Sequence, residues 1–287
     1  MNGGRLAMLS AILIGVSTVF SNLASKNTSP LLVSTYALLI SAALLFIIIF
    51  CTKNKIPSIY EISRSADFWK ITISRNIAGA VLLQYGLSMT SVISSVVMLR
   101  LEPVFVMAFG HLLLKEKMKT REILYVLAMI VGAILMSTAG NLSLGTAQIG
   151  DLLIALAVVF MGYSYIPVRR ITQNSDPVQI TAFSNFAGGL VLLVASVIIL
   201  PSLVMSDKAF GFTMASVILF YVIGLTLWFK SLKTTKAWIV ASLLSLSPIA
   251  GGLIAFVWLG ESINFIQLVG ATIILVVSYK ISTEHKD

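Results

Sequence analysis

Three charged side chains in this sequence stand within long apolar stretches. Arg100 and Glu102 lie near the middle of one stretch, and Arg75 lies in the stretch before it. A charged group that faced lipid at the centre of a bilayer would cost about 2.5–3.5 kcal/mol, so we expect all three to face protein or water. The arginines could bind an anionic group, and the glutamate could bind an ammonium group or exchange a proton.

Two functional arrangements of these charges remain open from the sequence. Residues two positions apart on a regular helix point about 200° apart, so Arg100 and Glu102 should not face one cavity unless the helix is distorted. In the first arrangement Arg75 neutralises Glu102, and Arg100 is the cation that faces the cavity. In the second, Glu102 itself faces the cavity. A purely structural pair of Arg75 with Glu102 is the competing interpretation.

The stretch that holds Arg100 and Glu102 has a weaker copy later in the chain. An offset of 145 residues places Pro103 on Pro248. Each proline removes a backbone N–H and clashes with a carbonyl one turn earlier, so both should kink their helices. Such kinks are tolerated in lipid where they face protein or water. We therefore predict that both prolines line a cavity and move during gating, with a kink that serves packing alone as the alternative.

The two charges have no charged counterparts in the copy. The same offset places Arg100 on Ser245 and Glu102 on Ser247, so the fold does not require charge there. This difference favours a functional role. Further polar and aromatic groups at the same expected depth complete the predicted substrate-binding set, although each could serve packing instead. They are Tyr85, Tyr163, Trp238 and Ser242.

The elements that must hold these groups are membrane-spanning helices. Of 287 residues, 58% are hydrophobic and only 11% are charged, whereas a soluble domain averages about 25% charged residues. A bilayer core needs about 20 apolar residues per helix. Ten segments meet this requirement: 6–25, 31–51, 70–88, 91–114, 121–139, 149–168, 177–200, 211–229, 236–258 and 263–281. The sequence therefore predicts an all-α membrane protein with ten transmembrane helices.

The spans form two related sets. An offset of 147 residues places Gly15 on Gly162 and Pro30 on Pro177. The offset of 145 residues relates the fourth and ninth spans in the same way. We expect two five-helix repeats, residues 1–140 and residues 141–287. Because each repeat has an odd number of spans, the second must be inverted relative to the first. Inverted repeats with sites near the membrane midplane are frequent in secondary transporters.

Lysine and arginine residues predict the orientation. With a cytoplasmic N-terminus, sixteen of the 20 lie in cytoplasmic loops, and only Lys26 and Lys208 lie on the other side. Positive loops stay in the cytoplasm, so we expect a multi-pass protein of the inner or plasma membrane with both termini cytoplasmic. The same loops explain the net charge of +9 without a nucleic-acid partner. Glu116 is expected to pair with the lysines beside it.

The sequence shows no pattern for a metal, a cofactor or an enzyme active site. One cysteine and two histidines are too few for the usual metal clusters. The chain has no G-x-x-x-x-G-K-[ST] loop that would bind ATP. No spacing of a nucleophile and a base stands out. We therefore expect no cofactor, no metal site and no enzymatic activity.

A repeated motif carries a resemblance to a known family. The pattern L-x-x-x-P-V/I, then mostly apolar residues, then L-x-E, runs from Leu99 to Glu116 and again from Leu244 to Glu261. With the ten-span length and Ser29-Pro30 after the first span, it resembles the EamA-like members of the drug/metabolite transporter superfamily. The resemblance covers nearly the whole chain. It implies a central cavity between the first four helices of each repeat, with the fifth and tenth helices at the periphery.

These observations favour a secondary transporter that moves a small polar metabolite by alternating access. The resemblance and the two charge signs suggest an amino acid or related compound, and the resemblance suggests efflux. One alternative is a transporter of an organic anion or nucleotide-like metabolite, held by Arg100 and Arg75. Alternatives from other classes are an accessory subunit of a membrane-embedded lipid-modifying enzyme and a helical scaffold. Besides the substrate and the lipid bilayer, a coupling proton and a homodimer partner are expected.

Overall fold

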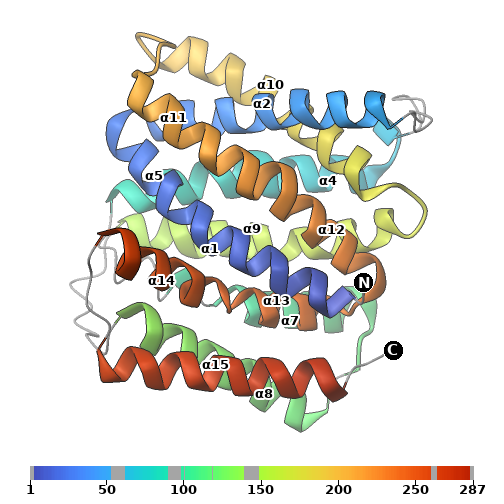
Figure 1. Ribbon diagram of the computed structural model, residues 1–287. Coiled ribbons are helices and arrows are strands. Elements are labelled where there is room, and N and C mark those ends of the chain that lie inside the picture. The colour runs from blue at the N-terminus through green and yellow to red at the C-terminus, as the bar shows by residue number, and fades with distance from the viewer. Residues whose placement is uncertain are drawn as a thin grey trace.

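A computed structural model of the chain describes residues 3–52, 62–89, 98–99, 101–117, 119–138, 149–259 and 264–284. All regular secondary structure within these ranges is helical. The helices lie side by side as one bundle, and the start of α1 and the end of α15 lie at the same side of it (Figure 1). Arg100 and Glu261, two residues of interest in the sequence, lie outside the described ranges.

Six helices or helical runs are long and apolar enough to cross a membrane. They are α1 (Gly3–Asn27), α2 (Pro30–Cys51), α9 (Ile149–Thr172), α10 (Pro177–Ile199), the run of α11 (Asp207–Ser216), η2 (Val217–Gly224) and α12 (Leu225–Thr234), and the run of α13 (Ala237–Leu244) and α14 (Ser247–Leu259). The chain is therefore a multi-pass membrane protein.

The other expected spans also correspond to helices. They are the run of α4 (Ala66–Ile71), η1 (Thr72–Gly79) and α5 (Ala80–Met89), followed by α7 (Glu102–Leu114), α8 (Thr120–Thr138) and α15 (Phe265–Glu284). The third span begins at Ala66 rather than at residue 70. The first part of the expected fourth span lies outside the described residues, so only its second part, α7, can be compared.

Two short π-helical segments occupy matching places in the chain. The segments η1 and η2 are separated by 145 residues at both ends, the same offset that relates the two prolines. Each ends on a glycine, Gly79 or Gly224. An added Cβ atom would lie 2.8 Å from the carbonyl oxygen of Ser74 and 3.0 Å from that of Leu219, respectively. Because π-helices are rare and often occur at functional sites, their paired occurrence makes these two spans candidates for a functional site.

The two prolines start new helices rather than bend continuous ones. Pro103 lies in the first turn of α7, after a turn at Leu101. Pro248 is the second residue of α14, after a break between α13 and α14. The first turn of a helix tolerates proline because the N–H that proline lacks has no partner there in any helix. The predicted kinks are thus breaks in the two spans.

The first helix of each half packs on the fourth span of the other half. An added Cβ atom at Gly15 of α1 would lie 2.1 Å from the carbonyl oxygen of Ser247 in α14. One at Gly162 of α9 would lie 3.0 Å from Cβ of Phe105 in α7. Both glycines therefore allow close contacts between helices from the first and second parts of the chain.

The helices α8 and α15 form a pair at one edge of the bundle (Figure 1). An added Cβ atom at Gly132 would lie 3.0 Å from the carbonyl oxygen of Gly270, so small residues bring the two helices together. This arrangement agrees with the peripheral place that the resemblance implies for the fifth and tenth spans. A central cavity is therefore expected among the remaining helices.

Candidate functional site

Arg75 lies at the meeting place of three helices. It belongs to η1, in the first half of the chain, and is partly buried. Its guanidinium carbon lies 4.1 Å from the ring centroid of Trp228 in α12, and its Nη1 atom lies 3.5 Å from the Oγ atom of Ser164 in α9. A cation over the face of a tryptophan ring is stabilised by the ring's quadrupole. One residue of the first half thus contacts two of the second.

Trp228 and Tyr165 form an aromatic wall beside Arg75. Both side chains are fully buried, and their rings meet edge to face with centroids 4.6 Å apart. Among the described residues, the indole N–H of Trp228 and the hydroxyl of Tyr165 have no hydrogen bond of normal geometry, and the hydroxyl lies close to both Trp228 and Glu102. Buried polar atoms normally have hydrogen-bond partners of good geometry. The Trp228 N–H and the Tyr165 hydroxyl are therefore candidate contacts for a ligand or a water molecule.

Glu102 lies near the same cluster. It is the first residue of α7, where a negative charge interacts favourably with the helix dipole, and it is partly buried. The Tyr165 hydroxyl lies within electrostatic range of both Glu102 and Arg75. The two charges that the sequence places at similar depth therefore act on one hydroxyl group. A direct pair between Arg75 and Glu102 stays a prediction, since the Arg75 contacts in the structure are with Ser164 and Trp228.

The other predicted site residues lie in different surroundings. Tyr163 meets Phe109 of α7 edge to face, with ring centroids 5.7 Å apart. Trp238 and Ser242 are fully buried in α13, and the Ser242 hydroxyl donates to the Trp238 carbonyl at 2.8 Å. Tyr85 is partly buried in α5. Their roles in binding remain predictions, as does that of Arg100.

The predicted binding set omitted Ser164 and Trp228, which contact Arg75, and Tyr165, which packs on Trp228. Tyr165 has the expected depth, but it follows Tyr163 by two positions and points to another side of α9. Trp228 is far from Arg75 in the sequence, and no pattern links the two. The repeat carries a signal for Arg75 but none for these partners. The offset of 145 residues places Arg75 on Phe220, within η2, so the two π-helical segments differ by one charge.

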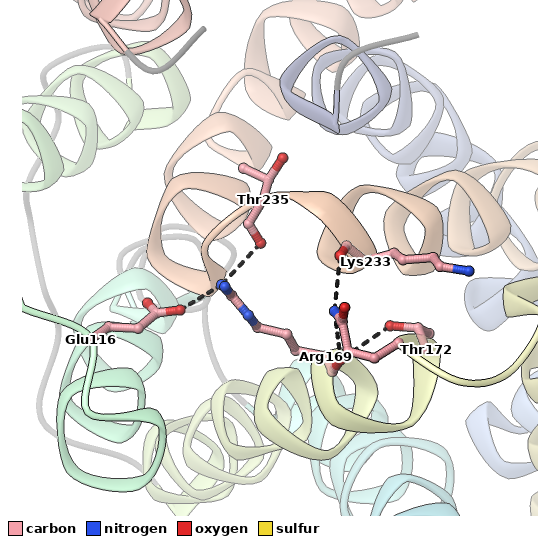
Figure 2. Close-up of polar contacts among 6 residues, drawn as sticks. Glu116, Arg169, Thr172, Lys233 and Thr235 are labelled. Atoms are coloured by element: carbon pink, nitrogen blue, oxygen red, sulfur yellow. Dashed lines mark hydrogen bonds and ion pairs between the residues drawn. The ribbon is translucent and has the colours of Figure 1, made fainter. Parts of the chain in front are cut away.

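A second polar cluster joins the ends of three helices, as Figure 2 shows. The Arg169 Nη1 atom at the end of α9 lies 2.5 Å from the Glu116 Oε1 atom just beyond α7. The same Nη1 atom donates to the Thr235 carbonyl between α12 and α13 at 3.0 Å. Nearby, Gln173 donates to the Lys233 carbonyl at 2.8 Å. We call the pair of Glu116 and Arg169 the Glu116–Arg169 bridge.

Local backbone geometry places Glu116 in this bridge. Lys115 adopts a left-handed conformation with φ of 54°, which ends α7 and turns the chain back. The Glu116 N–H then donates to the Gly110 carbonyl at 3.2 Å. The prediction that Glu116 pairs with its neighbouring lysines was wrong. The turn directs its carboxylate towards α9, where an arginine of the other half is the partner.

Comparison with known proteins decides the family. The EamA-like transporter family matches residues 1–138 and 148–283. The chain belongs to this family. An uncharacterized transporter of Methanothermobacter thermautotrophicus is 23% identical over 297 aligned residues, which cover 95% of this chain and 84% of that protein.

Two further comparisons extend this result. A probable amino-acid metabolite efflux pump of Salmonella typhimurium is 23% identical, with 95% of this chain and 92% of that protein covered. A solved crystal structure superposes with a TM-score of 0.83 at 15% sequence identity, covering 98% of this chain and 96% of that one. The last comparison concerns the fold alone, because its sequence identity is low.

Proposed function

We propose that this EamA-like protein is a secondary transporter that moves a small polar metabolite by alternating access, with its substrate site at the Arg75 cluster. The observation that carries the proposal is the position of Arg75. A charged side chain of one half stacks on Trp228 and reaches Ser164 of the other half, inside an apolar helical bundle. Ionisable groups within membrane segments characteristically mark substrate or ion pathways.

Paired features of the two halves support alternating access. The π-helical segments, the proline breaks and the two glycine contacts recur at nearly constant offsets. These correspondences support inverted repeats over residues 1–140 and 141–287. In such transporters, one repeat rocks against the other around a site near the midplane. The Glu116–Arg169 bridge joins the halves at one end of the bundle, and it would have to open when that end opens.

An amino acid or a related metabolite is the favoured substrate, and export is the favoured direction. The efflux pump of Salmonella typhimurium, to which the chain is similar along its length, is named for amino-acid metabolites. Arg75 and Glu102, which both lie near Tyr165, offer charges of both signs to a zwitterion. An organic anion is the second candidate, because among the described residues Arg75 directly contacts only the neutral Ser164 and Trp228.

Transport in liposomes tests this proposal. Purified protein should exchange a radiolabelled amino acid across the membrane with no nucleotide present, and empty liposomes should not. A matched control is the variant Arg5→Gln, which removes an exposed arginine of α1 outside the cluster and should transport like the parent. Uptake that required ATP would contradict a secondary transporter.

A further inference from the structure

The Arg75 guanidinium has unused hydrogen-bonding capacity. An arginine side chain carries five N–H donors in one plane. Within the described ranges, Arg75 makes a single side-chain hydrogen bond, to Ser164, at the long distance of 3.5 Å. The guanidinium carbon lies 4.1 Å from the centroid of the Trp228 ring, a contact that is not a conventional hydrogen bond. Most of the guanidinium donors are therefore not used by the described residues.

Among the residues that the structure describes, Arg75 also has no directly bound anion. Within the described ranges, the ion pairs found are Lys70 with Asp67 and Arg169 with Glu116. No carboxylate of these ranges lies within ion-pair distance of Arg75. A cation at this depth in a bilayer is costly unless an anion or water compensates it. The position thus suits a negatively charged ligand.

Two more donors lie next to this cation. The Trp228 indole N–H can only donate, and the Tyr165 hydroxyl can donate or accept. Both groups are fully buried, and neither makes a hydrogen bond of normal geometry to a described residue, although the Tyr165 hydroxyl lies close to Trp228 and Glu102. An oxyanion has several lone pairs and could accept from the guanidinium and from one or both of these groups. The aromatic rings that carry them offer an apolar surface to the rest of the ligand.

We propose that Arg75, Trp228 and Tyr165 bind the carboxylate of an organic monocarboxylate with an apolar carbon skeleton. The proposal rests on the transport function given above and names the ligand class of that site. A single guanidinium matches the single charge and planar shape of a carboxylate. A phosphate dianion fits less well, because Glu102 adds a negative charge near the same Tyr165 hydroxyl. Glu102 can instead accept an ammonium group, so α-amino acids fall within the class.

Thermal stabilisation of the purified full-length protein provides a test that does not depend on transport. Four probes at millimolar concentration separate the ligand groups: L-leucine, 4-methylpentanoate, L-leucinamide and inorganic phosphate. Leucinamide lacks the carboxylate of leucine, and 4-methylpentanoate lacks its ammonium group. We expect leucine and 4-methylpentanoate to raise the Tm, and leucinamide and phosphate to leave it unchanged. Equal stabilisation by leucine and leucinamide, or none by either carboxylate, would overturn the proposal.

Variants assign the effect to Arg75. Arg75→Gln should weaken carboxylate binding by roughly tenfold or more, because a charge-assisted hydrogen bond is lost. Arg75→Lys keeps the charge but not the planar donor edge, and it should also bind more weakly. Arg5→Gln, which removes an exposed arginine, should bind like the parent. If the Arg75→Lys and Arg75→Gln variants both fold and both bind the carboxylate as tightly as the parent, Arg75 does not bind the carboxylate.

A third variant guards against loss of fold. Trp228→Phe keeps an aromatic ring in the core but removes the indole N–H. It should reduce the affinity for the carboxylate. It should also change the Tm of the ligand-free protein less than Arg75→Gln does. The liposome assay separates this proposal from the transport function. Carboxylate binding without exchange would contradict transport alone, whereas exchange of leucine and leucinamide at equal rates would contradict the carboxylate site alone.

Discussion

Glu116 and Arg169 hold together two helices from different halves of the chain. The carboxylate just beyond α7 and the guanidinium at the end of α9 lie 2.5 Å apart, and the Glu116 side chain is only 8% exposed. The Arg169 side chain, 27% exposed, also reaches the Thr235 carbonyl. The bridge therefore fastens three helix ends at one side of the bundle.

The bridge should stabilise the state seen in this structure. Glu116→Gln leaves Arg169 without its anion, and it should lower the free energy of unfolding by about 1–3 kcal/mol. Adding Arg169→Gln should recover part of this loss, because no unpaired charge then remains. Thermal unfolding of the purified variants measures both effects.

A matched control comes from an exposed pair. Asp67→Asn removes the partner of Lys70, whose side chain is 43% exposed and lies 3.5 Å from Asp67. The change should alter stability by no more than about 1 kcal/mol. If Glu116→Gln had an effect as small as that of Asp67→Asn, the bridge would not stabilise this state.

The π-helical segments should each require their terminal glycine. Gly79→Ala and Gly224→Ala would place a Cβ atom 2.8 Å and 3.0 Å from backbone carbonyl oxygens, so both should lower stability, by about 1–3 kcal/mol. Gly211→Ala is the control, because an added Cβ atom there meets nothing within 4 Å. That change should be neutral or stabilise the protein by up to about 1 kcal/mol. Equal Tm changes at Gly79 and Gly211 would mean that the π-helix does not need its glycine.

Glu102 is expected to be balanced by Arg75 through their shared surroundings. Glu102→Gln alone should lower the Tm, because Arg75, which lies near the same Tyr165 hydroxyl but beyond ion-pair distance of Glu102, then has less negative charge around it. Adding Arg75→Gln should restore much of the Tm. Thermal unfolding of the single and double variants provides the measurement. If Glu102→Gln instead folds normally and loses only the pH dependence of transport, Glu102 is the coupling site.

The distribution of lysine and arginine predicts which loops face the cytoplasm. With Cys51 replaced by serine, a cysteine at Asp207 should react with an impermeant thiol reagent added to intact cells, and one at Thr120 should not. Asp207 and Thr120 are both exposed, so burial would not mask the difference. Permeabilised cells should label at both positions. Labelling at Thr120 in intact cells would reverse the orientation.

The sequence alone determined the class of protein and the places of most helices. A chain with so few charges and such long apolar stretches is not stable as a fold in water, but it is stable in lipid. Composition therefore predicts membrane helices directly. The offsets of 145 and 147 residues also marked the positions where the structure has its proline breaks and close glycine contacts. These features are local in the chain, because a proline or a glycine acts on the backbone around it.

The tertiary structure decided which side chains meet. Arg75 contacts Trp228 and Ser164 only because the first half packs against the second, and no spacing in the sequence encodes that contact. Glu116 meets Arg169 rather than a neighbouring lysine because the left-handed Lys115 turns the chain towards α9. The π-helical segments likewise could not be predicted from the apolar pattern. A π-helix bonds each N–H to the carbonyl five residues earlier instead of four, which turns the side chains in other directions while the composition stays the same. Periodicity specifies a helix, but the partners of its polar groups depend on how the helices pack.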